Sequence, residues 1–343
     1  MKKKLAVLLA STMMLAMLAG CGGGSTTGET TTATDESGSA ETITFVMGNA
    51  APVSEDNQLY QWCEEFKRLV SEATDGQIVI ENHYASELGG ERDLFEGVQL
   101  GTVDMCIIAN GPVGNFVPDV LAFDFPFLFR DYDHVTKVFD GEIGDRLSAS
   151  IEEKAGVVML DWAINGFRQL VNSVRPVEHP SDLEGMKVRT MENQIHMETF
   201  AALGADPTPM NGSELYTALQ QGIVDAMESP LTYIIPSKFY EVQDYLSMTN
   251  HFYSPSVVAM NKAKFEALTP EQQEIMLSCA EQATAYQTEF CLSMDEKLAD
   301  EAANIHGMEV VYTDMEEFRE ATQVVYDNHP EYAEILAEIS AVK

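Results

Sequence analysis

Positive charge is scarce in this chain. Its 343 residues include 20 lysines and arginines against 55 aspartates and glutamates, a formal net charge of −35. Loss of Lys2, Lys3 and Lys4 with the leader described below would bring the charge to −38. Such a surface excludes nucleic acid and polybasic lipid contact as functions. An anionic ligand would need a local positive site, because the rest of the protein repels it.

Cysteines are few and unpatterned. Cys63, Cys106, Cys279 and Cys291 form no CxxC pair and lack the spacing of metal ligands. We expect four buried free thiols, no metal and no cofactor. Cys279 and Cys291 fall on one expected helix, where twelve residues separate them by about 18 Å, too far for a disulfide.

Catalytic signatures are missing as well. The chain contains no GxSxG, HExxH, GxxxxGK[S/T] or GxGxxG motif. We therefore expect a protein that is not an enzyme. Seven histidines and many carboxylates leave an enzyme site without a motif open as an alternative.

Long apolar runs are limited to the amino terminus. Residues 1–20 read as a signal peptide, because a lysine-rich start precedes the apolar run Leu5 to Leu18, which is short for a membrane span. The run ends in Leu-Ala-Gly-Cys21, which resembles a lipobox and predicts a lipid on Cys21. An ordinary signal peptide with a chance cysteine is the alternative. Residues 21–41 contain no core-forming side chains and predict a flexible tether.

The body that follows predicts alternating strands and helices, hence an α/β fold. Expected strands are 43–47, 77–80, 103–108, 156–160, 187–190 and 223–227, and expected helices are 56–73, 91–100, 191–203 and 213–221. The first strands and helices alternate, which predicts a sheet that is parallel at least in part.

One helix stands out by its length. Thr269 and Pro270 are a good N-cap and first helical residue, and no further Gly or Pro interrupts the pattern before His306-Gly307. About 36 residues of helix would span roughly 54 Å. Such a helix either runs along two domains or contains a kink.

Six runs, in this order, resemble the extracytoplasmic solute-binding proteins of TRAP transporters, the DctP-type family. They are LGGERDLFEGVQLGTVDM (88–105), FDFPFLFRDYDHVTKVFDG (123–141), NGFRQLVNSVRPVEHPSDLEGMKVR (165–189), LGADPTPMNGSELYTALQQGIVDAMESP (203–230), KFYEVQDYLSMTNHFYS (238–254) and LTPEQQEIM (268–276). The resemblance covers nearly the whole body.

The resemblance implies two α/β domains around a ligand cleft, as in periplasmic binding proteins, joined by a long helix that spans both. We expect domain I to comprise 42–165 plus about 255–294, and domain II 166–254 plus about 295–343. It also implies a monomer outside the cytoplasm that hands a small organic acid to TRAP membrane permease subunits. The alternative is a binding protein of an ATP-driven importer, which would share the lipid anchor, the two-domain cleft and the mode of ligand binding.

Arg189 is the expected clamp for the ligand carboxylate. It sits where a strand gives way to a helix, a place where α/β proteins bind ligands, and its planar fork matches a carboxylate. The family places its clamping arginine in the motif matched here by Met186-Lys-Val-Arg189. The alternative is a surface ion pair with Glu184 or Glu192.

Other candidate ligand-binding residues surround this arginine in the expected cleft. By resemblance, Arg168 lies near the ligand or supports the clamp, and an interdomain structural ion pair is its alternative. Further candidates are Glu192, Asn193, His196, Asn49, Glu91 and Asn110. Each has a plain structural alternative: a helix-dipole partner for Glu192, a half-buried histidine for His196, and turn residues for Asn49, Glu91 and Asn110.

The chain departs from the common family pattern at two places. Asn211-Gly212 stands where members often have an aromatic residue, and Ser229 replaces a usual asparagine. A pocket without that aromatic wall would be roomier and more hydrophilic. We therefore expect a hexuronate or related sugar acid, ahead of C4-dicarboxylates and sialic acid, and count Asn211 and Ser229 among the ligand-binding residues.

Overall fold

A computed structural model describes residues 42–343. The predicted signal peptide, the tether and the lipidation site Cys21 therefore lie outside the described residues. Within residues 42–343, no helix is both long enough and apolar enough to span a membrane. The described part is a mixed α/β fold that contains two sheets, as expected.

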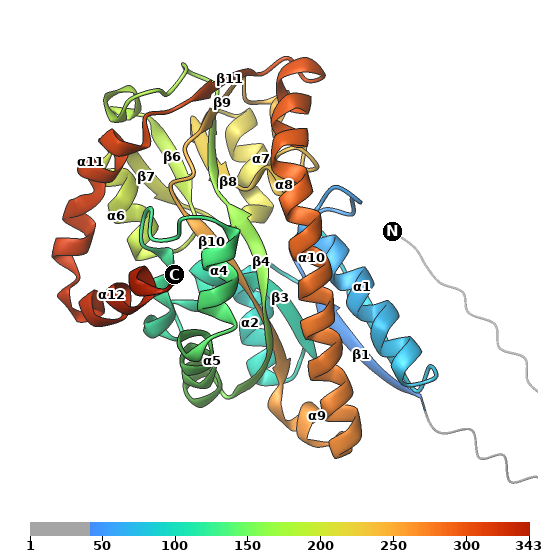
Figure 1. Ribbon diagram of the computed structural model, residues 1–343. Coiled ribbons are helices and arrows are strands. Elements are labelled where there is room, and N and C mark those ends of the chain that lie inside the picture. The colour runs from blue at the N-terminus through green and yellow to red at the C-terminus, as the bar shows by residue number, and fades with distance from the viewer. Residues whose placement is uncertain (1–41) are drawn as a thin grey trace, which may run out of the picture. The chain divides into compact units, whose positions relative to one another are not determined.

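The first sheet has the strand order β2-β1-β3-β10-β4 (Figure 1). β1 pairs in parallel with β2 and β3, whereas β10 is antiparallel to both β3 and β4. The sheet is thus parallel only in part, because β10, which follows most of the second sheet in the sequence, pairs antiparallel with its neighbours. Its strands are β1 (Ile43–Gly48), β2 (Ile78–His83), β3 (Met105–Ala109), β4 (Val157–Phe167) and β10 (Tyr253–Asn261).

The second sheet has the strand order β11-β9-β5-β8-β6-β7. β6 is parallel to β7 and β8, and β5 is antiparallel to β8 and β9. Its strands are β5 (Gln169–Asn172), β6 (Lys187–Thr190), β7 (Asp206–Pro209), β8 (Ala226–Ser229), β9 (Tyr245–Met248) and β11 (Glu309–Tyr312). The chain crosses from one sheet to the other after Phe167 and returns before Tyr253.

Helices cover both sheets (Figure 1). They are α1 (Gln58–Ala73), α2 (Glu91–Leu100), α3 (Asn110–Val113), α4 (Tyr132–Phe139), α5 (Glu142–Ala155), α6 (Gln194–Ala202), α7 (Gly212–Gln220), α8 (Leu231–Ile234), α9 (Lys262–Glu266), α10 (Pro270–Asn304), α11 (Met315–Asn328) and α12 (Ala333–Ala341). Short 3-10 turns occur at Pro118–Asp124, Pro180–Leu183, Phe239–Glu241 and Pro330–Tyr332.

Helix α10 runs without a break along both sheets. Thr269 caps it by accepting from the backbone N–H of Gln272, whose side chain accepts in return from the N–H of Thr269. Met276 belongs to the core cluster of the first sheet, and Leu298 belongs to a cluster of the second sheet. The prediction of one helix spanning both α/β parts is confirmed.

Several expected elements match closely and others were missed. α2 has the expected bounds, and Gly101 ends it in the left-handed conformation with φ 77°. The expected strand 156–160 extends as β4 to Phe167. No expectation covered β5, β7, β9, β10 or β11. The four cysteines of residues 42–343 are free and buried, as predicted.

The domain boundaries remain a prediction. The two crossings near Phe167 and Tyr253 agree in position with the expected limits. Helix α12 shows that the carboxyl terminus also contacts the first sheet's helices, because Arg146 of α5 pairs with Glu338 and Leu336 lies in the core cluster that contains Leu147.

Candidate functional site

One cavity lies between the two sheets, at the ends of their parallel strands. Ala50 follows β1, Ala109 ends β3, Arg189 lies near the end of β6 and Ser229 ends β8. Ligands of α/β proteins bind at this end of a sheet. The full lining is Ala50, Ala51, Leu59, Glu91, Ala109, Asn165, Arg168, Arg189, Met191, Gly212, Ser229 and Tyr233.

Arg189 is buried in this cavity, with 5% of its surface exposed. Its Nε and Nη2 groups both donate to the carbonyl oxygen of Met210, at 2.9 and 2.6 Å. Among residues 42–343 it has no carboxylate ion-pair partner: Glu192 instead lies 3.4 Å from Arg92, and the Glu184 carbonyl accepts from Arg175. The alternative of a surface pair with either glutamate is therefore wrong.

Arg189 is a buried cation whose charge is not neutralised by an ion pair within residues 42–343. Burial lowers the pKa of its guanidinium, the charge of Glu228 raises it, and Arg168 lowers it again. An arginine nevertheless stays protonated in proteins. The cavity therefore contains a desolvated positive charge without an ionic partner from the described chain.

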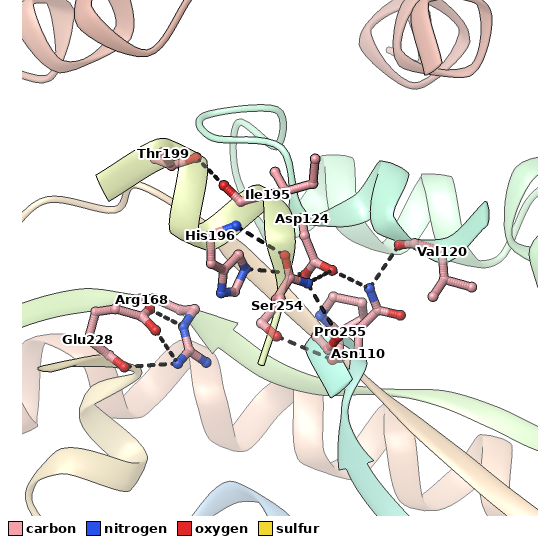
Figure 2. Close-up of polar contacts among 12 residues, drawn as sticks. Asn110, Val120, Asp124, Arg168, Ile195, His196, Thr199, Glu228, Ser254 and Pro255 are labelled. Atoms are coloured by element: carbon pink, nitrogen blue, oxygen red, sulfur yellow. Dashed lines mark hydrogen bonds and ion pairs between the residues drawn. The ribbon is translucent and has the colours of Figure 1, made fainter. Parts of the chain in front are cut away.

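Arg168 lies in the same cavity but has a partner. It is 2% exposed and makes a two-point contact with the fully buried Glu228: Nε donates to Oε2, and Nη2 donates to Oε1 at 2.9 Å (Figure 2). His251 Nε2 lies 3.4 Å from the same carboxylate. Burial opposes ionisation of Glu228, but Arg168 and His251 together hold its pKa well below the usual range. Arg168 lines the cavity and forms an ion pair, but its partner Glu228 belongs to the same expected domain, 166–254, so the alternative of an interdomain pair is wrong.

Glu91 and Ser229 complete the predicted residues of this cavity. Glu91 begins α2, and its carboxylate accepts from the backbone N–H of Ala109 at 2.8 Å. Burial raises the pKa of Glu91, while that hydrogen bond and the charges of Arg189 and Arg168 lower it. Glu91 is therefore an acceptor placed opposite the arginines.

Asn211 and Glu192 line a small cavity that adjoins the first one and shares Glu91 and Arg189 with it. Asn211 caps α7 by accepting from the N–H of Ser213. Gly90 approaches it so closely that a Cβ on Gly90 would overlap the Asn211 amide. A residue with a Cβ at this position would displace the Asn211 side chain, so Gly90 allows the segment before α2 to approach the segment before α7.

Three predicted residues lie elsewhere, in a buried polar network around Asp124: Asn110 and His196, which Figure 2 shows, and Asn193. Asp124 accepts from Asn110 Nδ2 at 2.9 Å and from Asn193 Nδ2 at 2.8 Å, and its other oxygen lies 3.5 Å from His196 Nε2. The His196 ring stacks on Phe252. None of Asn110, Asn193 and His196 lines the Arg189 cavity.

Asn49 does not line that cavity either. Its Oδ1 accepts from the N–H of Ala51 at 2.9 Å, and its Nδ2 lies 3.1 Å from Cys63 Sγ. These contacts are those of a turn residue, which was the alternative for this position.

The expectations missed Tyr233, Asn165 and Met191 as lining residues. Tyr233 of α8 lines the cavity, and its hydroxyl lies beside Gly212, so the cavity has an aromatic side chain from elsewhere although Asn211 stands where the family often has one. Burial raises the pKa of the Tyr233 phenol. No local signal marks Tyr233, because α8 is a four-residue helix that tertiary contacts place at the cavity.

Within residues 42–343, no group of three or more His, Cys, Asp and Glu side chains is arranged to hold a metal. The chemical groups at the site are a free guanidinium, a second guanidinium in an ion pair, a carboxylate, a phenol and a hydroxyl. Such a set has the chemistry suited to a small polar anion.

Residues 49–332 match the family described as bacterial extracellular solute-binding protein, family 7, or DctP. The 2,3-diketo-L-gulonate-binding periplasmic protein YiaO of Escherichia coli is 38% identical over 253 residues, 74% of this chain and 76% of that protein.

Solved structures of TRAP periplasmic solute-binding proteins are also similar to this chain. A TRAP periplasmic solute-binding protein of Polaromonas sp. JS666 bound to D-erythronate is 39% identical, with a TM-score of 0.85 over 88% of this chain and 99% of the other. One of Sulfitobacter sp. NAS-14.1 with bound β-D-galacturonate is 31% identical, with a TM-score of 0.80 over 87% and 98%.

Proposed function

The chain belongs to the DctP family of TRAP-type extracellular solute-binding proteins, which are not enzymes, and we propose that it captures a sugar acid through an Arg189–carboxylate clamp. The single observation that carries the proposal is the burial of Arg189 without a carboxylate partner among the described residues. A buried charge is costly unless it is paired, so the site favours an anionic ligand.

The free donors of Arg189 suit a carboxylate. A guanidinium has five N–H donors, and the Met210 carbonyl uses one on Nε and one on Nη2. Both donors on Nη1 and one on Nη2 remain. One donor on Nη1 and the remaining donor on Nη2 form the pair that a carboxylate meets end-on, with two parallel hydrogen bonds.

The remaining polar groups favour a ligand that has hydroxyls. Glu91 offers an acceptor, Arg168 a second cation, and Ser229 and Tyr233 a hydroxyl each. Relatives whose names or structures record 2,3-diketo-L-gulonate, D-erythronate or β-D-galacturonate support a sugar acid. A hexuronate or a related aldonic or keto acid is the ligand class that we propose for this chain.

Capture requires the two domains to move. The cavity beside Arg189 has a volume of about 40 Å³, room for only two or three water molecules. Entry of a sugar acid therefore needs separation of walls that belong to different sheets. Contacts of one ligand with both walls would then stabilise the closed arrangement. We take residues 42–165 with 255–294, and 166–254 with 295–343, as the moving domains, except that α12 packs against α5 and would move with the first of them.

Delivery follows capture. The closed form would be the one that TRAP permease subunits recognise, and a lipid on Cys21 would keep a monomeric protein at the outer face of the cell membrane. The family assignment supports recognition by the permease, and the lipobox-like run Leu-Ala-Gly-Cys21 supports the lipid.

A thermal-shift panel tests the ligand class. Hexuronates, aldonates, C4-dicarboxylates and sialic acid are compared with neutral sugars of matching size. A ligand at a hundred times its Kd stabilises by about 2.7 kcal/mol, a shift of a few degrees. A shift with a sugar acid and none with its neutral sugar supports the clamp. Shifts with neutral sugars alone would make Arg189 structural.

A further inference from the structure

A second and larger cavity adjoins the Arg189 cavity. It has a volume of about 300 Å³ and shares Gly212 and Tyr233 with the first one, so the two spaces lie on either side of the same wall. Typical ligand cavities measure about 300–1,000 Å³. The two cavities adjoin at Gly212 and Tyr233. A ligand whose carboxylate binds Arg189 therefore has room for its far end in the second cavity.

The charge of the second cavity is unusual for this protein. Its lining contains Lys238 and the hydroxyls of Ser86, Ser213 and Ser237, but no carboxylate. Four other cavities in residues 42–343 each include at least one carboxylate, such as Glu91 in the Arg189 cavity. In a chain with 55 acidic residues, a wall with one cation and no acid attracts anions.

Lys238 is available for such a contact. It is exposed, and among residues 42–343 no carboxylate forms an ion pair with it. Its backbone is left-handed, with φ 61°, and the N–H donates to the Ile235 carbonyl at 2.9 Å. Ala85 and Ser86 on the lining are left-handed too, with φ 53° and 59°. Non-glycine residues adopt this conformation rarely, and such residues cluster at ligand sites.

We propose that Lys238 is a specificity-determining residue, and that this cavity selects sugar acids that carry a second carboxylate at the end remote from Arg189. The inference rests on the proposed function, because it assumes that the first carboxylate is held by Arg189. The serine hydroxyls would donate to the same carboxylate. Among the sugar acids, this cavity then favours an aldarate-type diacid over a monoacid.

The test compares two acids that differ only at the far end. D-Galactonate and galactarate share a six-carbon chain, and galactarate has a carboxylate at both ends. Calorimetry measures the Kd of each for the wild type and for Lys238→Met, which keeps most of the length of the side chain and removes its charge. Lys187→Met is the matched control. Lys187 is exposed, has no carboxylate ion-pair partner among residues 42–343, and lines neither cavity.

We expect the wild type to bind galactarate about tenfold more tightly than galactonate. Lys238→Met should weaken galactarate about tenfold and leave galactonate within twofold, whereas Lys187→Met should change neither. Wild-type binding of galactonate as tight as that of galactarate would overturn the inference, as would an equal loss of both acids in Lys238→Met. Either result leaves the Arg189 clamp standing. Binding of neither acid, with neutral sugars bound instead, would overturn the proposed function and this inference with it.

Discussion

Replacement of Arg189 by methionine should abolish tight ligand binding and leave the fold intact. Methionine keeps much of the apolar stem and removes the guanidinium. The donors that remain after the bonds to Met210 would make two charge-assisted hydrogen bonds to a carboxylate, each contributing about 1.5–3 kcal/mol. A loss of about 3–6 kcal/mol corresponds to roughly a hundredfold to ten-thousandfold increase in Kd.

The stability of the free protein should respond differently. Arg189→Met relieves the desolvation of a buried charge, which is stabilising, but leaves the Met210 carbonyl without its donors, which costs about 1–3 kcal/mol. Because the two effects oppose each other, we expect the Tm of the free protein to change by no more than about 4 °C.

Calorimetry with the sugar acid that gives the largest thermal shift measures the effect. Arg175→Met is the matched control, because Arg175 also donates to backbone carbonyls, those of Asp182 and Glu184, and lies outside the cavity. Arg189→Lys separates charge from geometry, since lysine cannot form the planar fork. The loss should persist at high salt, because a buried pair is poorly screened. A Kd within threefold of wild type in a folded Arg189→Met protein would refute the clamp.

Four further predictions follow from the ion pair, the long helix and the leader. Arg168→Met leaves Glu228 buried and unpaired, so urea unfolding should show a loss of about 3–5 kcal/mol, and a loss below 1 kcal/mol would contradict the pairing. Because the folded pKa of Glu228 lies below its ordinary 4.5, this contribution is present above that pH and falls as the pH drops below it; Glu228→Gln should flatten the acid limb of a stability–pH curve. Thr269→Ala should cost about 1 kcal/mol by uncapping α10, whereas Thr269→Ser should restore the cap, and equal unfolding midpoints would argue against it. Cys21→Ser should move the protein from the membrane fraction to the soluble fraction, and an unchanged distribution would exclude the lipid anchor.

Long elements with local signals could be predicted from the sequence. α2 has a regular apolar period, and α10 has a long run without Gly or Pro. Their ends carry Gly101 and Thr269, residues that fix helix ends through contacts within a few positions. The motif runs also led to the family. Most strands of the second sheet could not be predicted, because they are four residues long and their hydrogen-bond partners lie far away in the sequence.

At the site, the sequence by itself placed Arg189 at the end of an expected strand and named Arg168 and Glu91 as further candidates. Tertiary structure alone decided which polar residues face the ligand cavity. Asn193 and Asn110 turn inward because Asp124, buried and 69 and 14 residues away in the chain, accepts from both. Glu228 meets Arg168 across 60 residues, and Tyr233 reaches the cavity from a helix too short to predict. Buried polar and charged groups find their partners among residues that the fold brings close, often from distant parts of the chain. The hydrophobic periodicity of a sequence reports only local spacing, so it does not predict these contacts.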